Sequence, residues 1–224
     1  MKKGLFILIG VFALLSAFNV SGQRKLTEAT ISYDIVINTT NTSPEAVDML
    51  DGATSIIYLK GNFSRSEMVS SLGTQSTIID GKTGGATILK EYGEQKYMIK
   101  MTPVEWKESN KRYEDILFTY FEEYKTIAGY KCQKAVGRLK DSTTFTVYFT
   151  KDLVPVNKDF QYLNRNLPGL AMQYEASFGK GVVTYSVSGI NFNIVPQGKL
   201  DLPKSGYRVM TYEESKAAKG GAHR

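Results

Sequence analysis

Residues 170–195 alternate between apolar and polar side chains, and this pattern restricts the fold of the chain more than any other. In the first half of the stretch, the apolar residues at alternate positions are Met172, Tyr174, Ala176 and Phe178. A two-residue period is typical of a strand with one buried face, because neighbouring side chains point to opposite sides of a sheet. Gly179-Lys180-Gly181 then predicts a turn that reverses the chain.

The second half of the stretch changes phase once. Its apolar residues at alternate positions are Val183, Tyr185 and Val187, and then Ile190, Phe192 and Ile194. The change falls at Gly189, where an extra residue can bulge out of a strand at little cost. Long strands with a bulge are typical of strongly curved sheets. We therefore predict a mainly β fold, either a strongly curved antiparallel sheet or an unclosed half-barrel.

Further strands are expected on both sides of a central polar segment. Apolar alternation or β-branched residues predict strands at 31–37, 116–120, 130–139 and 143–150. Residues 55–101 form a series of short strands separated by glycine-containing turns. Because no helical pattern separates these strands, they are expected to pair antiparallel.

A few short helices are expected to cover the concave face of the sheet. One is predicted at 43–52, which begins with a Ser-Pro pair and ends at a glycine. Another, of about two turns, is predicted after Asn157, with Phe160 and Leu163 on one side. Residues 102–112 suit either a short helix or a long loop, anchored to the sheet by Trp106.

The N-terminus has the features of a secretory signal peptide. Lys2 and Lys3 precede an apolar run at 5–18, and small residues follow at 20–22. The run is shorter than the roughly 20 residues that a membrane span needs. We expect residues 1–22 to be removed and the mature protein to be periplasmic or secreted, not integral to the membrane. An uncleaved N-terminal anchor is the alternative.

The expected mature chain is one domain with a short tail. Residues 23–210 are enough for a single core and are expected to form one curved antiparallel domain. Residues 211–224 are expected to form a short C-terminal helix and a flexible end. Thr211 and Glu214 have the spacing of a capping box for that helix, which is expected to end at Gly220.

Cysteine and charge usage narrow the function classes. Cys132 is the only cysteine, so an internal disulfide is excluded, and the thiol is expected to be buried and inert. Pairing of an exposed Cys132 with a partner is the alternative. The net charge of +6 is scattered along the chain and forms no basic stripe, so a nucleic-acid partner is not expected.

The sequence carries no recognisable catalytic or metal-binding motif. His223 is the only histidine and lies next to the C-terminus, which argues against catalytic triads and His-ligated zinc. Gly81-Lys82-Thr83 lacks the earlier glycine of a phosphate loop and reads as a turn. The pairs Glu114-Asp115 and Glu122-Glu123 would point to opposite faces of a strand. We expect no cofactor, no metal and no enzymatic activity, although a site built from residues distant in sequence stays open.

Aromatic residues are the most promising candidates for a binding site. The chain has 14 Tyr, 11 Phe and 7 Met residues. Those expected on the inner face of the sheet, and predicted to contact a ligand, are Phe145, Phe149, Tyr174, Tyr185 and Phe192. A concave apolar face is filled either by the protein's own helices or by an apolar ligand. Both alternatives stay open at this point.

Three short blocks give the chain a family resemblance. The blocks are Thr126–Ala135, Leu167-Pro168-Gly169-Leu170 with Met172-Gln173-Tyr174-Glu175, and Leu202–Tyr207. Together they resemble the GLPGLI-type exported envelope proteins of Gram-negative bacteria. Asn166 and Ala171 stand where the motif has glycine and isoleucine, so the chain is similar to a closely related group of unknown function.

A fourth block resembles a broader fold. Ile78–Lys82 is similar to a turn in the LolA/LolB-type lipoprotein carriers, whose fold is an unclosed β-barrel with helices in its mouth. The resemblances imply a fold and a compartment, and they imply lipid binding only by analogy of fold. The leading hypothesis is a non-enzymatic envelope protein that binds an apolar ligand or lipid in the concavity, or shields a lipid-modified partner. The alternatives are a module that docks an envelope protein on a sheet edge and, less favoured, an enzyme.

Overall fold

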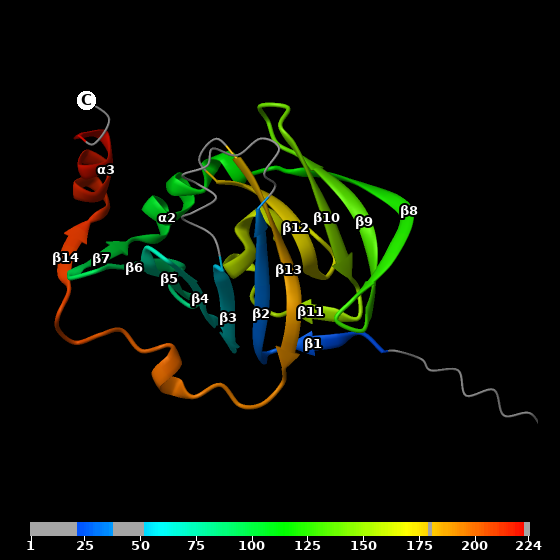
Figure 1. The fold of residues 1–224 in the computed structure, drawn as a ribbon, viewed down its shortest axis with the longest axis horizontal. Coiled ribbons are helices and arrows are strands. Elements are labelled where there is room, and N and C mark those ends of the chain that lie inside the picture. The colour runs from blue at the N-terminus through cyan, green and yellow to red at the C-terminus, as the bar shows by residue number, and fades with distance from the viewer. Residues whose placement is uncertain (1–21, 38–51, 179–180, 222–224) are drawn as a thin grey trace, which may run out of the picture.

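The computed structural model describes residues 22–37, 52–178 and 181–221. The expected signal peptide before Gly22, the expected helix at 43–52 before Gly52, and two residues of the hairpin turn lie outside this part of the chain. Its main element is a twelve-stranded sheet in the order β14-β7-β6-β5-β4-β3-β2-β13-β12-β10-β9-β8. The sheet curves without closing, which confirms the predicted half-barrel (Figure 1).

Most strands of the sheet are of ordinary length and follow one another as hairpins. Its strands are β2 (Glu28–Ile37), β3 (Thr54–Lys60), β4 (Phe63–Ser70), β5 (Gly73–Asp80), β6 (Gly85–Tyr92), β7 (Gln95–Met101), β8 (Leu117–Ile127), β9 (Tyr130–Arg138), β10 (Thr144–Thr150), β12 (Leu170–Phe178), β13 (Gly181–Asn191) and β14 (Arg208–Thr211). A separate two-stranded sheet pairs β1 (Arg24–Leu26) with β11 (Leu153–Pro155). In the large sheet all neighbours are antiparallel except β14, which joins β7 in parallel. The sequence pattern did not predict this parallel edge strand.

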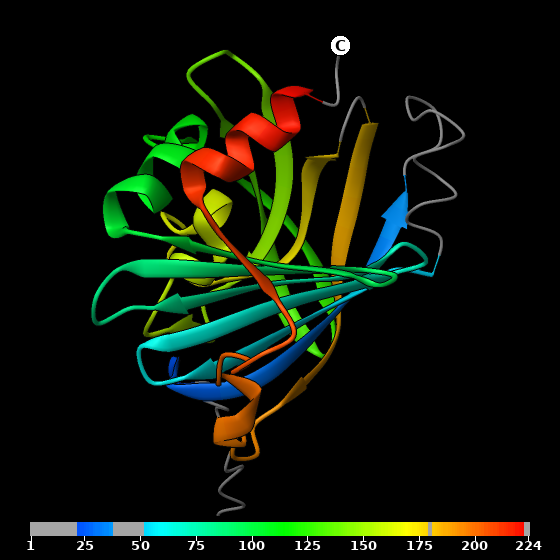
Figure 2. The ribbon, with the colours of Figure 1, turned by 90° about the vertical axis from the view of Figure 1, so that its left-hand side faces the viewer.

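The predicted bulged hairpin is present as β12 and β13. The pairing of β13 with β2 shifts register between Val187 and Gly189, where the change of phase predicts a bulge. The strand ends at Asn191, earlier than the predicted Val195. Ile194 is 80% exposed, so it does not continue the buried face. After Asn191 the chain leaves the strand pairing of the sheet and runs over the convex face towards β14 (Figure 2).

The helices are short and lie over the concave side of the sheet. They are α2 (Pro103–Ser109) and α3 (Tyr212–Gly221), together with the 3₁₀ turns η2 (Lys111–Tyr113), η3 (Asp159–Asn164) and η4 (Gln197–Lys199), the last of which lies on the opposite side. Between the two readings of residues 102–112, the helix is correct, because Thr102 and Glu105 form a reciprocal capping box. The Trp106 ring packs edge-on against Tyr162 of η3 at a centroid distance of 6.2 Å, so this contact joins α2 to η3, whereas the sequence predicted an anchor on the sheet.

The segment after Asn157 differs from its prediction. Oδ1 of Asn157 accepts a hydrogen bond from the Asp159 amide, as expected at a helix start. The segment then forms 3₁₀ turns with non-helical backbone at Gln161, not a two-turn α-helix. As a result Phe160 and Leu163 pack against two different buried clusters and do not share one side. The Thr211–Glu214 capping box is confirmed, and it opens α3.

The core occupies the region enclosed by the hairpin and the neighbouring strands. Ile35, Tyr185, Tyr174 and Val147 are direct cross-strand partners from β2 to β10, so their side chains share one face. Cys132 is fully buried, as predicted. A second register shift, between Tyr148 and Phe149, was not predicted and places Ala171 opposite Phe149.

The C-terminal segment (residues 192–207) crosses the convex face of the sheet before it joins the edge as β14 (Figure 2). Val195 and Leu200 pack with Tyr58 on this face. Tyr207 packs against a buried group of residues from β5, β6 and β7. The β3–β7 part of the sheet is therefore covered on its convex side by this segment and on its concave side by helices.

Candidate functional site

A groove lies between α3 and the edge of the sheet. Its volume is about 740 Å³. It is lined by residues of β6, β7, β14 and α3, namely Lys90, Tyr92, Gln95, Tyr97, Ile99, Arg208, Met210, Glu214, Ser215, Ala217 and Ala218. This volume lies in the range of about 300–1,000 Å³ that is common for small-molecule sites.

The floor of this α3 groove consists of two rows of cross-strand partners. Lys90, Tyr97 and Arg208 are directly paired across β6, β7 and β14 and therefore share one face. Two residues further along the strands, Ile88 pairs with Ile99 and Ile99 pairs with Met210. The first row is polar and cationic, whereas the second is apolar. The floor thus changes from polar and cationic to apolar along the strand direction.

A smaller cavity of about 170 Å³ continues the groove towards α2. The two hollows share Lys90, Ile99 and Ser215. The smaller one adds Ile88 and Met101 from the sheet, with further walls from Ser109 of α2 and from Tyr212 and Lys216 of α3. Met101 pairs with Ala86 and begins a third, apolar row. The apolar part of the site therefore extends inwards from the sheet edge.

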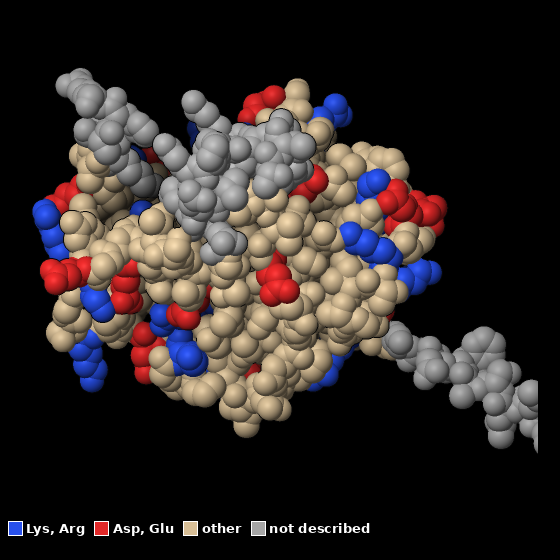
Figure 3. Space-filling view, viewed as in Figure 1, with Lys and Arg blue, Asp and Glu red and all other residues tan. Residues whose placement is uncertain are grey.

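Charges at the α3 groove have both signs but an excess of cations on the floor. Lys90 and Arg208 project from the sheet, and Glu214 lies on the helix wall. The carboxylate of Glu214 accepts a hydrogen bond from the Thr211 amide at 2.7 Å, and this bond lowers its pKa, with a smaller contribution from Arg208. Lys216 is already paired with Glu213 at 2.7 Å and with Glu108 at 3.6 Å. On the face drawn in Figure 3, acidic and basic residues are intermixed and form no large patch of one sign.

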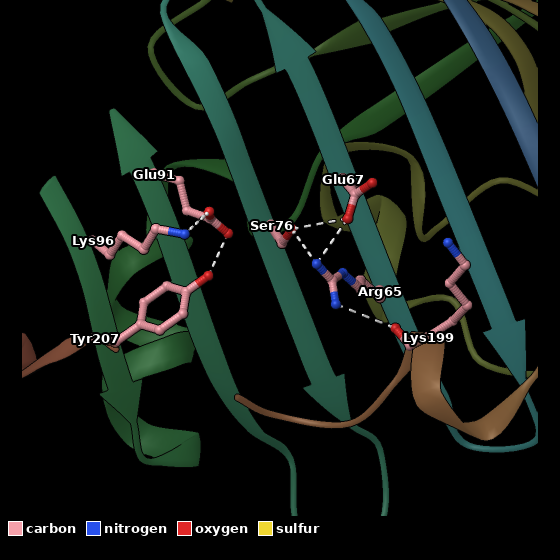
Figure 4. A network of polar contacts seen from close by, with 7 residues as sticks. All are labelled: Arg65, Glu67, Ser76, Glu91, Lys96, Lys199 and Tyr207. Atoms are coloured by element: carbon pink, nitrogen blue, oxygen red, sulfur yellow. Dashed lines mark hydrogen bonds and ion pairs between the residues drawn. The ribbon is translucent and has the colours of Figure 1, made fainter. Parts of the chain in front are cut away.

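A polar network on the convex face holds β14 in place (Figure 4). The Tyr207 hydroxyl donates to Oε1 of Glu91, and Lys96 pairs with the other oxygen of Glu91 at 2.8 Å. Arg65 pairs with Glu67 at 2.7 Å and reaches the Lys199 carbonyl at 3.4 Å. Because adjacent residues of an extended chain point to opposite faces, fixing Tyr207 on the convex side directs Arg208 into the α3 groove.

The predicted aromatic residues lie in a different region. Phe145 lines a separate cavity of about 210 Å³ beside β10 and β12, whose wall also includes Tyr113, Leu163 and Ala176. Here β12 pairs with β10 only up to Tyr174, so the two strands separate above that point. The Glu175 carboxylate bridges the gap by accepting a hydrogen bond from the Thr146 amide at 2.7 Å.

The other four predicted residues pack among core side chains. Phe149 is fully buried and meets Tyr120 edge-on at 5.6 Å. The Tyr174 and Tyr185 rings are stacked with their centroids 4.9 Å apart, and burial raises the pKa of both. The Arg24 guanidinium lies over the Phe192 ring, with its Cζ 3.8 Å from the ring centroid. Phe149 belongs to the same buried cluster as Phe145. Tyr174 packs against both large clusters, whereas Tyr185 and Phe192 pack against the other one. Ligand contact by these five residues stays a prediction.

One member of each acidic pair singled out in the sequence is bound closely to a lysine. Glu123 pairs with Lys134 at 2.7 Å, and Asp115 pairs with Lys140 at 2.9 Å. Their pKa values are lowered mainly by these lysine contacts. Within residues 22–37, 52–178 and 181–221, no group of three or more His, Cys, Asp or Glu side chains is close enough to hold a metal ion. The same part of the chain has no helix with the length and apolar character of a membrane span.

Comparison with known proteins supports the fold. No protein-family model and no curated protein matches the chain. Among solved structures, the chain is similar to an uncharacterized conserved protein from Thermus thermophilus, with 12% identity and a TM-score of 0.51 over 83% of this chain and 91% of that one. At this identity the likeness extends to the fold alone.

Two further solved structures are similar at lower scores. PNGF-II is 12% identical with a TM-score of 0.46; the match covers 84% of this chain but 32% of PNGF-II, so the chain spans about a third of its length. A LolA superfamily protein from Nitrosomonas europaea is 10% identical with a TM-score of 0.30, over 78% of this chain and 89% of that one.

Sequence reasoning missed the α3 groove. The sequence predicts short strands over 55–101, a range that includes Tyr97 and Ile99, and a capping box at Thr211. Their meeting depends on the parallel pairing of β14 with β7, between segments more than a hundred residues apart. The available signal was weak: two apolar residues, Val209 and Met210, stand between Arg208 and the capping box, which is compatible with a short edge strand.

Proposed function

We propose that this chain is an exported, non-enzymatic envelope protein that binds an apolar ligand in the concavity of its half-barrel. The single observation that carries the proposal is the α3 groove, whose apolar floor of Ile99 and Met210 is walled by Ala217 and Ala218. The small alanine side chains leave room over an apolar surface. Such a surface is favourable to cover with an acyl chain, at roughly 25 cal/mol per Å² of apolar area removed from water.

Two structural features favour a binding role over a purely structural one. The groove lies at a sheet edge, where its mouth is accessible, and it continues inwards as a second hollow below α2 and α3. Within residues 212–218 of its wall α3, Ser215 is the buried residue. A short helix with little buried surface can shift to admit a bulky apolar ligand.

Purification of the mature protein from cells without detergent tests the proposal. Native mass spectrometry is expected to show a bound lipid-like molecule, and a polarity-sensitive fluorescent probe is expected to brighten after that molecule is removed. Ala218→Trp fills the groove and is expected to abolish both signals. Lys131→Trp places the same bulk on the exposed side of β9, at a residue that lines neither hollow, and is expected to leave both signals unchanged. A wild-type protein that carries no ligand and does not bind the probe contradicts the proposal.

A second candidate function is supported by β8. This strand of 11 residues is the last in the sheet and exposes Leu117, Tyr120, Phe121 and Tyr124. A register shift between Tyr120 and Tyr124 interrupts its pairing with β9, as bulges at protected edges often do. An extended segment of another envelope protein could pair with this edge. Cross-linking in cells from position 121, compared with position 151 on the surface, tests this function separately from lipid binding.

A further inference from the structure

We infer that the gap between β10 and β12 is a docking site for an extended peptide segment of a partner protein. The segment inserts as an additional strand and places one apolar side chain in the cavity beside Phe145. The α3 groove takes no part in this docking, which therefore goes beyond the proposed function. Two backbone edges that face each other across the gap carry the inference, together with a carboxylate that occupies part of the place of a missing strand.

The β10 side of the gap presents backbone groups that have no strand beside them. In the part of the chain that the structure describes, β10 pairs with β12 only over residues 147–150. The Thr143 carbonyl accepts a hydrogen bond from the Leu139 amide at 2.9 Å, so the backbone groups of Thr143 point towards β9. Successive residues of an antiparallel strand direct these groups to alternate sides. Those of Thr144 and Thr146 therefore point into the gap.

The β12 side of the gap presents a matching edge. Phe178 pairs with Gly181 across the two-residue turn of the hairpin, so the backbone groups of Phe178 point towards β13. By the same alternation, those of Glu175 and Ser177 point towards β10. Both residues lie beyond Tyr174, where the pairing with β10 has ended. Each side of the gap therefore carries N–H donors and C=O acceptors, and an inserted strand has the complementary pattern of partial charges.

The Glu175 carboxylate takes the part of one carbonyl of the missing strand. It accepts a hydrogen bond from the Thr146 amide at 2.7 Å, across the gap. Elsewhere in the sheet, a carbonyl of the neighbouring strand accepts such a bond. Glu175 also lines two hollows, the cavity of about 210 Å³ that contains Phe145 and another of about 200 Å³ that contains Tyr148. Rotation of this one side chain away from the gap frees the Thr146 amide for a partner.

The two hollows indicate which side chains the inserted peptide carries. The cavity beside Phe145 has an apolar wall that includes Leu139 and Leu163. The other hollow has polar lining residues, among them Thr146 and Thr184. Successive side chains of a strand point to opposite faces of a sheet. A peptide with one apolar residue between two small polar residues therefore fits the gap.

The charged residues at the gap already have partners, so the peptide needs no charge of its own. Arg112 lines the cavity beside Phe145 and pairs with Asp141 at 3.2 Å. Lys125 lines the other hollow, where its ammonium lies 3.7 Å from the centroid of the Tyr148 ring. Main-chain hydrogen bonds and one apolar contact are thus expected to supply the affinity, as in other cases of strand addition.

Fluorescence anisotropy of a labelled Thr-Ser-Leu-Ser-Thr peptide, titrated with the mature protein, tests the inference. Glu175→Ala is expected to bind this peptide about fivefold more tightly, equivalent to about 1 kcal/mol, because no internal acceptor then competes for the Thr146 amide. Glu94→Ala removes the same charge at an exposed turn outside both hollows and is expected to leave the affinity unchanged. The same peptide with methylated backbone amides is expected to bind about tenfold more weakly, since it has lost its main-chain donors.

A photoreactive leucine at the centre of the peptide locates the bound segment. Cross-links to residues 143–146 or 175–177 support the inference, whereas cross-links confined to 117–127 assign the peptide to the β8 edge and overturn it. Equal affinities of the wild type and Glu175→Ala, or binding to neither protein, also overturn it. Ala218→Trp fills the α3 groove and is expected to leave peptide binding unchanged, so this test and the test of the proposed function can fail separately.

Discussion

The hydroxyl of Tyr207 donates a hydrogen bond to the carboxylate of Glu91 on the convex face of β6. The next residue, Arg208, begins β14 on the opposite face of the sheet. One contact therefore secures the end of the C-terminal segment and orients the edge strand that completes the α3 groove. The Glu91 carboxylate also binds Lys96, so three residues from three segments meet at this point (Figure 4).

Tyr207→Phe is expected to destabilise the protein by about 1 kcal/mol, the usual net contribution of one hydrogen bond. The ring keeps its packing, so the loss reports the hydroxyl alone. Urea denaturation measures the change. Tyr124→Phe removes a similar tyrosine–carboxylate bond, to Glu122 at 2.8 Å on the exposed β8 edge, and is expected to cost much less. Equal losses in the two variants would show that the Tyr207 bond has no special role.

The contact between Tyr207 and Glu91 is expected to stabilise the protein only within a certain pH range. Hydrogen bonds from Lys96 and Tyr207 lower the pKa of Glu91 below its ordinary 4.5, so the stability it contributes is present above that value and lost as the pH falls through the lower one. Burial and the bond to Glu91 raise the pKa of Tyr207 to about 12 from 10.0, so its contribution is present below pH 10 and lost as the pH rises towards 12. The stability difference between wild type and Tyr207→Phe is expected to be largest between about pH 5 and 9 and to shrink outside that range. Thermal denaturation of both proteins across this range measures it.

Substitution of two glycines of the hairpin region by alanine is expected to change the free energy of unfolding by very different amounts. A Cβ at Gly169 would lie 1.8 Å from the Thr150 carbonyl oxygen, whereas a Cβ at Gly189 would have nothing within 4 Å. The clashing atom belongs to the backbone, which cannot move aside as the end of a flexible side chain can. Gly169→Ala is therefore expected to lower the free energy of unfolding by about 3 kcal/mol or more. Gly189→Ala is expected to change the free energy of unfolding by less than about 1 kcal/mol. Chemical denaturation measures both, and a tolerated Gly169→Ala would contradict the close approach of β12 to Thr150.

These glycines show what the sequence could and could not predict. The change of phase around Gly189 indicates the bulge because alternation is a local property of consecutive residues. The sequence alone does not reveal that a close backbone contact requires glycine at position 169. Nor does it reveal that position 189 has free space for a side chain. Both facts depend on which strands are neighbours, and that is decided by contacts far apart in the chain.

In the candidate site, too, local features could be predicted from the sequence, whereas contacts between distant segments could not. Half-barrel curvature, the α3 capping box and the burial of Cys132 all follow from local patterns and were predicted. The α3 groove depends on the parallel docking of β14 on β7, which adds Arg208 and Met210 to rows begun by Tyr97 and Ile99. Four residues of β14 are too few for a clear period of two. The aromatic residues of the hairpin were more prominent in the sequence than the groove residues, because large side chains are needed first to fill the core.

Cys132 is expected to resist labelling in the native protein. The thiol is fully buried and donates to the Tyr130 carbonyl, and burial raises its pKa to about 11. At pH 8 the reactive thiolate is therefore about a thousandfold less abundant than the thiol. Ellman's reagent is expected to react only after unfolding in urea. Lys151→Cys in a Cys132→Ser background provides an exposed thiol for comparison, and equally fast native labelling of Cys132 would show that its surroundings open readily.

The Tyr33 hydroxyl is expected to be the most costly single polar group to remove from the core. It donates to the Ala171 carbonyl at 2.8 Å, and Tyr33 is 2% exposed. Tyr33→Phe keeps the edge-on contact with Tyr174 but leaves that carbonyl without this donor, so a loss of about 1–3 kcal/mol is expected. Burial raises the pKa of Tyr33, so the hydroxyl stays protonated and the loss is expected to be the same at pH 6 and pH 9. Urea denaturation at both values measures it, and a cost that is near zero or that changes between them would show that the bond is not made in solution.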